Sequence, residues 1–443
     1  MSIVKSNTKR TSVPRRHSRS ISKQSNTSLQ RSKSGKRSCK SKPERIFEPI
    51  QVDSTPVEFT ELGLDSALML GVNDRGYVRT TPIQNAVFSI VQTGHDLIAS
   101  AETGSGKTAA FLLPLMQQLI ERKALSESPD KVSVKTDESV AGYTKVLILV
   151  PTRELAVQIE DDFQGFAYHA GLSGVSVYGG VAMEPQERAL LAGVDFVVAT
   201  PGRLLDHMRG AAPNFKRLGA LVLDEADRMM DMGFWPDVRK IVSGLPSRGT
   251  SLGRLRQTLL FSATMPEDVI RLASELLYKP KYVQLGPRGE PARTIKHSAY
   301  KVITSQKTEW LARFLKKARG SALVFVQTKR GTDVIARRLV SLGIRAVAFH
   351  ADRTQPHRTE AVEGFRSGKY KVLVATDIAA RGLDIEGIEH VVNFEVPTSK
   401  DAYVHRVGRT GRADSTGHAV TLVAPEEHQK IRALEKVFNL QLG

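Results

Sequence analysis

The sequence predicts an α/β fold of two tandem domains, each a parallel sheet flanked by helices, and three observations support this prediction. Short apolar runs rich in Val, Ile and Leu alternate with longer segments at helical spacing. The runs lack the polar alternation of a half-exposed strand, which is typical of strands buried on both faces. A stretch rich in Gly, Pro and charge, residues 286–296, divides the runs into two series and predicts an interdomain linker.

Length and charge set the frame for these domains. The 443 residues, 41% of them hydrophobic, are enough for about two or three domain-sized cores. Fourteen Lys and Arg residues and a single acid, Glu44, fall within residues 1–45, which gives this head +13 of the chain's net +18. The head has no Phe, Tyr or Trp, so we expect a disordered tail attracted to polyanions. A merely solubilising tail and an organelle transit peptide are the alternatives.

The first series of runs predicts a domain over residues 46–285. Each run ends at a cluster that contains polar residues or glycine. Because ligands of a parallel sheet bind beyond the carboxyl ends of its strands, these clusters predict the functional edge of the domain. The strands are expected at residues 96–100, 146–150, 196–199, 220–223 and 259–261, with helices such as 154–166 and 268–277 between them.

The segment Ala101–Thr108, AETGSGKT, lies between the first of these strands and a helical run. Small residues followed by Gly-Lys-Thr predict a phosphate cradle, in which backbone N–H groups meet phosphate at a helix N-terminus. Lys107 can reach the outer phosphates, and Thr108 can hold Mg²⁺. The expected cradle residues are Thr103, Gly104, Ser105, Gly106, Lys107 and Thr108.

Two acids, Asp224 and Glu225, directly follow the buried run 220–223. In a phosphate-binding domain, one carboxylate at a strand end can hold Mg²⁺, and the next can orient or deprotonate the water that attacks the γ-phosphate. The loop and the acids together therefore predict a site that hydrolyses a nucleotide.

The second series of runs predicts a second α/β domain over residues 297–443, of similar architecture but without a detectable sequence repeat. Its strands are expected at residues 322–326, 345–349, 372–375, 391–394 and 419–423, with helices such as 331–342 and 357–365.

Taken together, these motifs resemble those of the DEAD-box RNA helicases, a family of ATP-driven RNA remodelling enzymes with two RecA-like domains. The resemblance covers roughly residues 59–440 and so nearly everything outside the head. The family reads adenine with a lone aromatic and a segment of the form GFxxPTPIQ. These correspond here to Phe59 and to GYVRTTPIQ, which ends in Gln84. Tyr77 and Thr80 depart from the family's Phe and Pro.

The resemblance implies a role for each motif of the ATP site. Lys107 and Thr108 bind phosphate and Mg²⁺. Asp224 holds the metal and Glu225 is the general base. In the second domain, HRVGRTGR implies two arginine fingers and TDIAARGLD implies a ribose contact, and these residues are Arg409, Arg412 and Asp384. Coupling between the nucleotide and RNA is implied for Asp227, Ser262, Thr264 and His405.

The resemblance also implies contacts to the RNA backbone from both domains. Arg side chains, Thr hydroxyls, glycine N–H groups and helix N-termini contact phosphate without reading bases. RNA binding is therefore expected to be independent of base sequence, with the 2′-OH distinguishing RNA from DNA. The expected RNA-contacting residues are Pro151, Thr152, Arg153, Gly180, Thr200, Arg203, Thr328, Gln355, Arg358, Thr376 and Arg381.

From this resemblance we expect an RNA-stimulated ATPase that uses ATP and Mg²⁺ to unwind short RNA duplexes or to remodel ribonucleoproteins. Its partners would be single-stranded or short duplex RNA and ribonucleoprotein or ribosome-assembly factors. We expect a monomer in the cytoplasm, or in an organelle or nucleus reached through the basic head. The sequence contains no run of about eighteen apolar residues, so it predicts no membrane-spanning helix.

Two other functions are open on the sequence. An RNA clamp would bind RNA together with ATP and hydrolyse very little of the ATP. The presence of all four residues implied in hydrolysis, Lys107, Glu225, Arg409 and Arg412, argues against a clamp. A DNA-unwinding relative of the RecQ type would carry a cysteine-rich zinc module. The single cysteine, Cys39, cannot build such a module.

Overall fold

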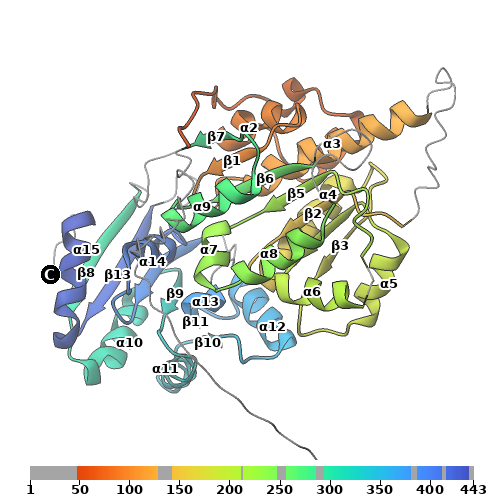
Figure 1. Cartoon of the computed structure of the whole chain (residues 1–443). Helices are drawn as coiled ribbons and strands as arrows, with labels where there is room; N and C mark the ends of the chain where they lie inside the picture. The colour runs from red at the N-terminus through yellow and green to blue at the C-terminus, as the bar shows by residue number, and fades with distance from the viewer. Residues whose placement is uncertain are drawn as a thin grey trace, which may run out of the picture. The chain divides into compact units, whose positions relative to one another are not determined.

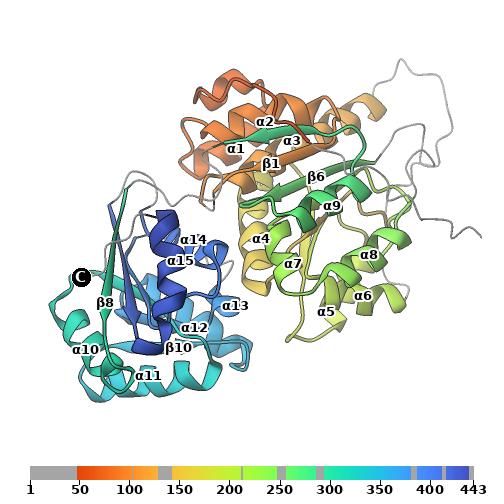
Figure 2. The ribbon, with the colours of Figure 1, turned by 60° about the vertical axis from the view of Figure 1, so that its left-hand side comes forward.

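The computed structural model describes residues 47–102, 104–127, 142–210, 213–246, 256–285, 294–380, 387–411 and 416–438. The predicted head, with Cys39, and most of the predicted linker lie outside these residues. The described residues form two parallel sheets flanked by helices (Figure 1 and Figure 2), so the predicted fold class is confirmed. No helix in the described ranges is long and apolar enough to cross a membrane.

The first sheet has seven strands in the order β3-β4-β2-β5-β6-β1-β7, and every neighbouring pair is parallel. The five strands expected from the apolar runs occupy its centre. The strands are β1 Leu97–Ser100, β2 Val146–Leu149, β3 Gly174–Val177, β4 Phe196–Ala199, β5 Ala220–Leu223, β6 Gln257–Ser262 and β7 Lys281–Gln284.

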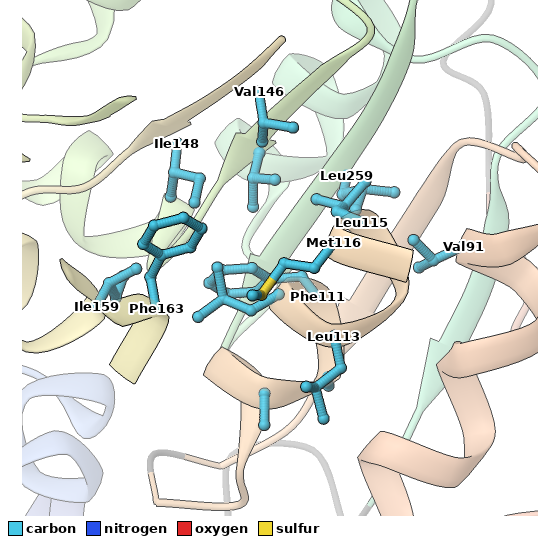
Figure 3. Packing of buried hydrophobic residues seen from close by; sticks show 14 of the residues in the cluster. Val91, Phe111, Leu113, Leu115, Met116, Val146, Ile148, Ile159, Phe163 and Leu259 are labelled. Carbon is cyan, nitrogen blue, oxygen red and sulfur yellow. The ribbon is translucent and has the colours of Figure 1, made fainter. Parts of the chain in front are cut away.

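Side chains that alternate along these strands enter two cores, one on each face of the sheet. Leu97 of β1 faces one core, and Ile98 beside it faces the other. In the first core, Phe111 of α3 and Phe163 of α4 pack near Ile148 of β2 (Figure 3). The helices of this core are α1 Ser66–Asp74, α2 Pro82–Gln92, α3 Lys107–Glu127 and α4 Arg153–Ala167, preceded by the 3₁₀ turn η1 Phe59–Leu62. The second core packs against α5 Glu184–Ala192, α6 Pro201–Arg209, α7 Ala226–Asp231, α8 Trp235–Gly244 and α9 Glu267–Leu276.

The second sheet has six strands in the order β10-β11-β9-β12-β13-β8, again all parallel. Its strands are β8 Ile295–Lys301, β9 Ser321–Phe325, β10 Ala346–Phe349, β11 Val372–Ala375, β12 Ile388–Asn393 and β13 Gly417–Val423. Its helices are α10 Lys307–Lys317, α11 Lys329–Ser341, α12 Gln355–Arg366, α13 Asp377–Ala380, α14 Lys400–Val407 and α15 His428–Phe438, with 3₁₀ turns η2 Thr304–Gln306 and η3 Pro425–Glu427.

Three strands were not predicted from the sequence, namely β3, β7 and β8, and all three are edge strands. Their sequences, GVSV, KYVQ and IKHSAYK, mix polar and apolar residues because an edge strand is covered less completely than a central one. A search for continuous apolar runs therefore passes over them. The strand β8 begins at Ile295, inside the range predicted as linker.

A buried ion pair fastens α10 to the second sheet. Lys307 is 2% exposed, and its Nζ donates to the carbonyls of Phe394 and Leu422 and to Oε2 of Glu427, at 2.8, 3.0 and 2.6 Å. Glu427 also accepts the backbone N–H of Val396 at 2.9 Å. Every polar atom of this pair thus has a role in joining the ends of β12 and β13 to a helix.

Replacing Lys307 by Met should lower the free energy of unfolding by about 3–5 kcal/mol, because it leaves the Glu427 carboxylate and two carbonyls buried without their cation. Urea unfolding followed by circular dichroism measures the change. The double variant Lys307→Met with Glu427→Gln should recover part of the loss. A single variant as stable as the wild type would show that the pair contributes nothing.

Candidate functional site

The strand order brings the predicted residues to the carboxyl edge of each sheet. In the first sheet, the phosphate loop follows β1 and the two acids follow β5, while predicted RNA contacts follow β2 and β4. In the second sheet, predicted RNA contacts follow β9, β10 and β11, and the string HRVGRTGR follows β12. Each sheet therefore has a half that carries the predicted RNA contacts and a neighbouring half that carries the predicted nucleotide contacts.

Lys107 opens α3 and reaches back into the phosphate loop. Its Nζ donates to the carbonyls of Ala101 at 2.8 Å and Glu102 at 3.3 Å. Burial lowers the pKa of Lys107, and the nearby carboxylates, first of all that of Asp224, oppose the shift. The ammonium thus lies at the loop, within the field of the acids that follow β5. Thr103 lies outside the described residues.

The loop depends on glycine at Gly106, whose φ of +87° favours a residue without a side chain. A Cβ there would lie 2.5 Å from Nε2 of Gln84. Gln84 Nε2 donates to the carbonyl of Gly106 at 3.2 Å, and its Oε1 accepts the N–H of Thr81 at 2.8 Å. The carboxamide therefore supports the loop and retains one N–H and one oxygen lone pair for a further partner such as adenine.

The aromatic Phe59 is enclosed by the first core at 1% exposure, edge-on to Tyr77 with the ring centroids 5.8 Å apart. Its contact with adenine stays a prediction. Thr80, which stands where the family has Pro, donates its N–H to the carbonyl of Val57 at 2.8 Å and accepts the N–H of Val57 on Oγ1 at 2.9 Å. Proline could make neither bond, so this departure ties the segment more closely to the preceding chain.

Asp224 is 3% exposed, and its Oδ1 accepts the N–H of Glu225 at 2.9 Å. Burial, helped by the neighbouring negative charge of Glu225, raises the pKa of Asp224 to about 7 against the opposing charge of Lys107. Ionising a carboxyl group that is buried in this way is costly, and a cation bound beside it would stabilise the charged form.

The donor set fits Mg²⁺. The Asp224 carboxylate and the Thr108 hydroxyl offer the oxygen ligands that this ion prefers. In the part of the chain that the structure describes, no group of three or more His, Cys, Asp or Glu side chains could hold a metal by itself. Mg²⁺ in nucleotide sites is bound by one or two protein oxygens together with the phosphates, so these two residues are the expected kind of ligand.

Glu225 has a left-handed backbone, with φ 52° and ψ 49°, at the start of α7. Both of its carboxylate oxygens accept hydrogen bonds from Nη1 of Arg228, at 2.7 and 2.6 Å. The Arg228 side chain is completely buried. This partner was not predicted from the sequence, although an acid and an arginine three residues apart at a helix start are a recognisable pair.

Asp227 joins α7 to the segment that follows β6. Its Oδ2 accepts both the N–H and the Oγ1–H of Thr264 at 2.8 Å, and Ser262 Oγ donates to the carbonyl of Thr264 at 2.6 Å. His405 Nε2 lies 3.6 Å from the same Oδ2. Burial alone would raise the pKa of Asp227, but His405, Arg228 and Thr264 together hold it below the usual value. Two of the predicted coupling residues, Thr264 and His405, therefore meet at the carboxylate of a third, Asp227, and Ser262 joins them through Thr264.

The predicted RNA contacts of the first sheet include a loop, Tyr178–Val181, that is fixed at both ends. Gln186 Nε2 donates to the carbonyl of Tyr178, and Arg203 Nη2 donates to the carbonyl of Val181, each at 3.1 Å. The Arg153 guanidinium lies against the loop so closely that a Cβ on Gly180 would overlap it. Arg153 and Arg203, which come from the starts of α4 and α6, thus meet the same glycine loop.

Replacing Gly180 by Ala should weaken RNA binding about tenfold, because its φ of +88° is unfavourable for alanine and the new Cβ displaces Arg153 from the loop. Fluorescence anisotropy with labelled single-stranded RNA and a non-hydrolysable ATP analogue measures the affinity. Gly210→Ala is the matched control, since Gly210 has a negative φ and its nearest neighbour would be 3.5 Å from the new Cβ. Equal RNA affinities for the two variants would contradict the predicted role of the loop.

Most of the predicted RNA contacts in both sheets lie at helix N-termini, where backbone N–H groups and the helix dipole favour phosphate. Thr152 and Thr328 cap α4 and α11 by accepting the N–H groups of Leu155 and Gly331, at 3.3 and 3.0 Å. The other predicted contacts at helix starts are Arg153, Thr200, Arg203, Gln355 and Thr376. Arg358 pairs with Glu154 of α4, with Nη2 and Oε1 2.7 Å apart. Pro151 lies two residues after the end of β2 and is buried.

The string HRVGRTGR separates into a structural and a candidate catalytic part. Arg406 is buried and donates to both carboxylate oxygens of Asp377, at 2.6 and 2.7 Å, and to Asn393 and the carbonyl of Glu395. It anchors α14 to the chain around Thr376. Arg409 follows the end of α14 and is 3% exposed. Arg412, Asp384 and Arg381 lie outside the described residues.

Comparisons with known proteins agree with this geometry. Residues 81–272 match the family model described as DEAD/DEAH box helicase, and residues 306–414 match the helicase conserved C-terminal domain. The chain is 39% identical over 388 residues to the ATP-dependent RNA helicase vasa of Drosophila melanogaster. This alignment covers 88% of this chain and 55% of vasa. It is 38% identical over 380 residues to the ATP-dependent RNA helicase CshA of Listeria monocytogenes, covering 86% of this chain and 68% of CshA. The chain thus spans little more than half of vasa and about two thirds of CshA.

Solved structures give the same result. A structure of Mss116p bound to single-stranded RNA and AMP-PNP aligns with a TM-score of 0.77 at 28% identity and covers 90% of this chain and 81% of that one. Dbp5 of S. cerevisiae bound to RNA and ADP BeF3 aligns with a TM-score of 0.72 at 26% identity, covering 87% of this chain and 95% of that one.

Proposed function

The chain belongs to the DEAD/DEAH box helicase family, and from that premise we propose that it is an RNA-stimulated ATPase that separates short RNA duplexes or remodels ribonucleoproteins. The observation that supports this best is the joint placement of the nucleotide and RNA candidates. Asp224 and Glu225 follow β5, which pairs with β2, the strand that Arg153 follows. Lys107 and Arg203 follow β1 and β4 at the same edge of this sheet. Hydrolysis of ATP and binding of RNA are therefore neighbouring events on one sheet edge.

ATP is proposed to bind with its phosphates in the Ala101–Thr108 loop and its adenine at Gln84. Mg²⁺, when bound by Asp224 and Thr108 with the phosphates, would neutralise charge that develops on the phosphate oxygens. A water oxygen attacks the γ-phosphorus, the bond from that phosphorus to the bridging oxygen breaks, and ADP leaves. Glu225 accepts the proton that the water loses, and Lys107 stabilises the charge on the outer phosphate oxygens.

RNA is proposed to bind by its backbone. The candidate contacts are helix N-termini, threonine hydroxyls, a glycine loop and arginines, all of which bind phosphate and none of which is arranged to read bases. The neighbours Mss116p and Dbp5, which are described as bound to RNA, support RNA as the ligand. Binding that ignores base sequence follows from this set of contacts.

The link between the two activities is proposed to run through Asp227. Its carboxylate holds Thr264, and through it the segment that follows β6, the strand between those that carry the phosphate loop and the acids. His405 of α14 reaches the same carboxylate. A change in nucleotide state at the acids can therefore alter the position of residues that the second sheet contributes.

A phosphate-release assay without nucleic acid, with single-stranded RNA and with single-stranded DNA tests the proposal. RNA should raise turnover at saturating ATP, and DNA should not. An RNA clamp would instead retain RNA in the presence of ATP with almost no phosphate released, and equal stimulation by DNA would exclude the RNA-specific function. Action as a monomer, assembly with ribonucleoprotein or ribosome-assembly partners, and a cytoplasmic location belong to the same proposal.

A further inference from the structure

Arg228 is the largest side chain that the structure buries completely, and it lies beside the proposed general base. It follows Asp227 in the sequence and belongs to the first turn of α7. Side chains of a helix point back toward its N-terminus, which directs Arg228 toward the residue three positions earlier. That residue is Glu225, and Nη1 of Arg228 donates to both of its carboxylate oxygens at 2.7 and 2.6 Å.

Glu225 is the only acid with which Arg228 forms an ion pair among the described residues. The other guanidinium nitrogens, Nε and Nη2, have no hydrogen-bond partner there. Desolvating a guanidinium is costly, and among the described residues the ion pair with Glu225 is what offsets this cost. The contact is therefore directed at one carboxylate and at no other part of α7.

The backbone of Glu225 adds a second restraint. Its φ of 52° lies in the left-handed region, which is uncommon for a residue with a side chain and is maintained only when the surroundings impose it. The backbone fixes the origin of the side chain, and Arg228 fixes its end. A carboxylate oxygen has two lone pairs, so each oxygen of Glu225 retains one for a water molecule while Arg228 occupies the other.

We propose that Arg228 is a positioning residue for ATP hydrolysis, which holds the Glu225 carboxylate in the orientation from which it accepts the proton of the attacking water. This inference rests on the proposed function, since it needs Glu225 to act as the base. Arg228 touches neither ATP nor water in this role. It acts only through Glu225, and this distinguishes it from an arginine that merely stabilises the fold.

The first test compares Arg228→Met and Arg228→Lys with the wild type in RNA-stimulated ATP hydrolysis. A base that is displaced by about an ångström loses catalysis but not binding, so kcat of Arg228→Met should fall about 10- to 100-fold while KM for ATP and the affinity for RNA change less than about twofold. Arg228→Lys keeps a charged donor and should have a kcat between those of Arg228→Met and the wild type.

The matched control is Lys307→Met, which removes one partner of a similarly buried ion pair of the second domain. Lys307 bonds Phe394, Leu422 and Glu427, none of which is a predicted site residue. The Lys307→Met variant should lose stability, as predicted above, and keep the wild-type kcat when assayed below its melting temperature. If Lys307→Met and Arg228→Met lose kcat equally, the effect of Arg228 is one of stability and the inference is wrong.

A double-mutant cycle is the sharper test, because it separates an effect through Glu225 from a general loss of stability in the Arg228→Met variant. If Arg228 acts through Glu225, adding Arg228→Met to Glu225→Gln should leave single-turnover hydrolysis unchanged from that of Glu225→Gln alone. A purely structural role would multiply the two losses. If the wild-type protein shows no RNA-stimulated turnover, the proposed function is wrong. If the wild type is active and Arg228→Met is equally active, only the inference about Arg228 is wrong.

Discussion

Protein that carries Glu225→Gln should bind ATP and RNA as the wild type does and hydrolyse ATP about 10²- to 10⁴-fold more slowly, the usual contribution of a general base. The amide has nearly the shape of the carboxylate, but it cannot take up the proton of the attacking water. Glu225 is 7% exposed and lies two residues after the end of β5. Because its proposed role is confined to proton transfer, the loss should appear in kcat and not in KM. Single-turnover hydrolysis with labelled ATP and saturating single-stranded RNA measures it.

The matched control for this change is Glu267→Gln in the first turn of α9, an exposed acid at a helix start. It should keep the full rate. Because Glu225→Gln also takes the ionic partner from Arg228, its melting temperature should be measured beside the rate. Turnover at the wild-type rate by a folded Glu225→Gln protein would show that another group accepts the proton, and the assignment of the acids would then have to be abandoned.

Sequence patterns predicted the centre of each sheet better than its edges. The runs 220–223 and 372–375 are apolar at every position because helices cover both faces of β5 and β11. A continuous apolar run of this kind is easy to recognise in a sequence. The edge strand β8 does not alternate: on one of its faces the buried Ile295 and Ala299 flank the half-exposed His297. Its pairing with β13 comes from tertiary contacts that no local window contains.

The candidate site shows a similar limit. Motifs placed Lys107, Glu225 and Asp227 at strand ends, since a motif records which residues touch the ligand. They did not show which residues hold those side chains in place. Arg228 and Arg406 stand inside or beside the same motifs, but their roles depend on distances that only folding sets, to Glu225 in one case and to Asp377 in the other.

Arg409→Gln should lower the RNA-stimulated rate of ATP hydrolysis by about 10³- to 10⁵-fold, the contribution expected of an arginine finger. Arg409 lies two residues after the end of α14, and its N–H donates to the carbonyl of Arg406 at 3.2 Å. Arg406 in turn is held by Asp377, next to the predicted RNA contact Thr376. The predicted finger is thus fixed to a helix that is itself anchored beside the predicted RNA contact Thr376. If RNA binds there, this anchoring is a physical reason for RNA to be needed before the finger acts.

Arg409→Lys separates charge from geometry, because lysine keeps the charge but lacks the planar fork that can donate two parallel hydrogen bonds to phosphate oxygens. It should therefore recover little of the rate. Arg432→Gln on the exposed face of α15 is the control for loss of a positive charge and should keep full activity. If Arg409→Gln lost the response to RNA but kept the slow rate measured without RNA, Arg409 would act only after RNA binds. An equal loss with and without RNA would mean that the finger is in place before RNA arrives, and the anchoring of α14 beside Thr376 would not explain RNA stimulation.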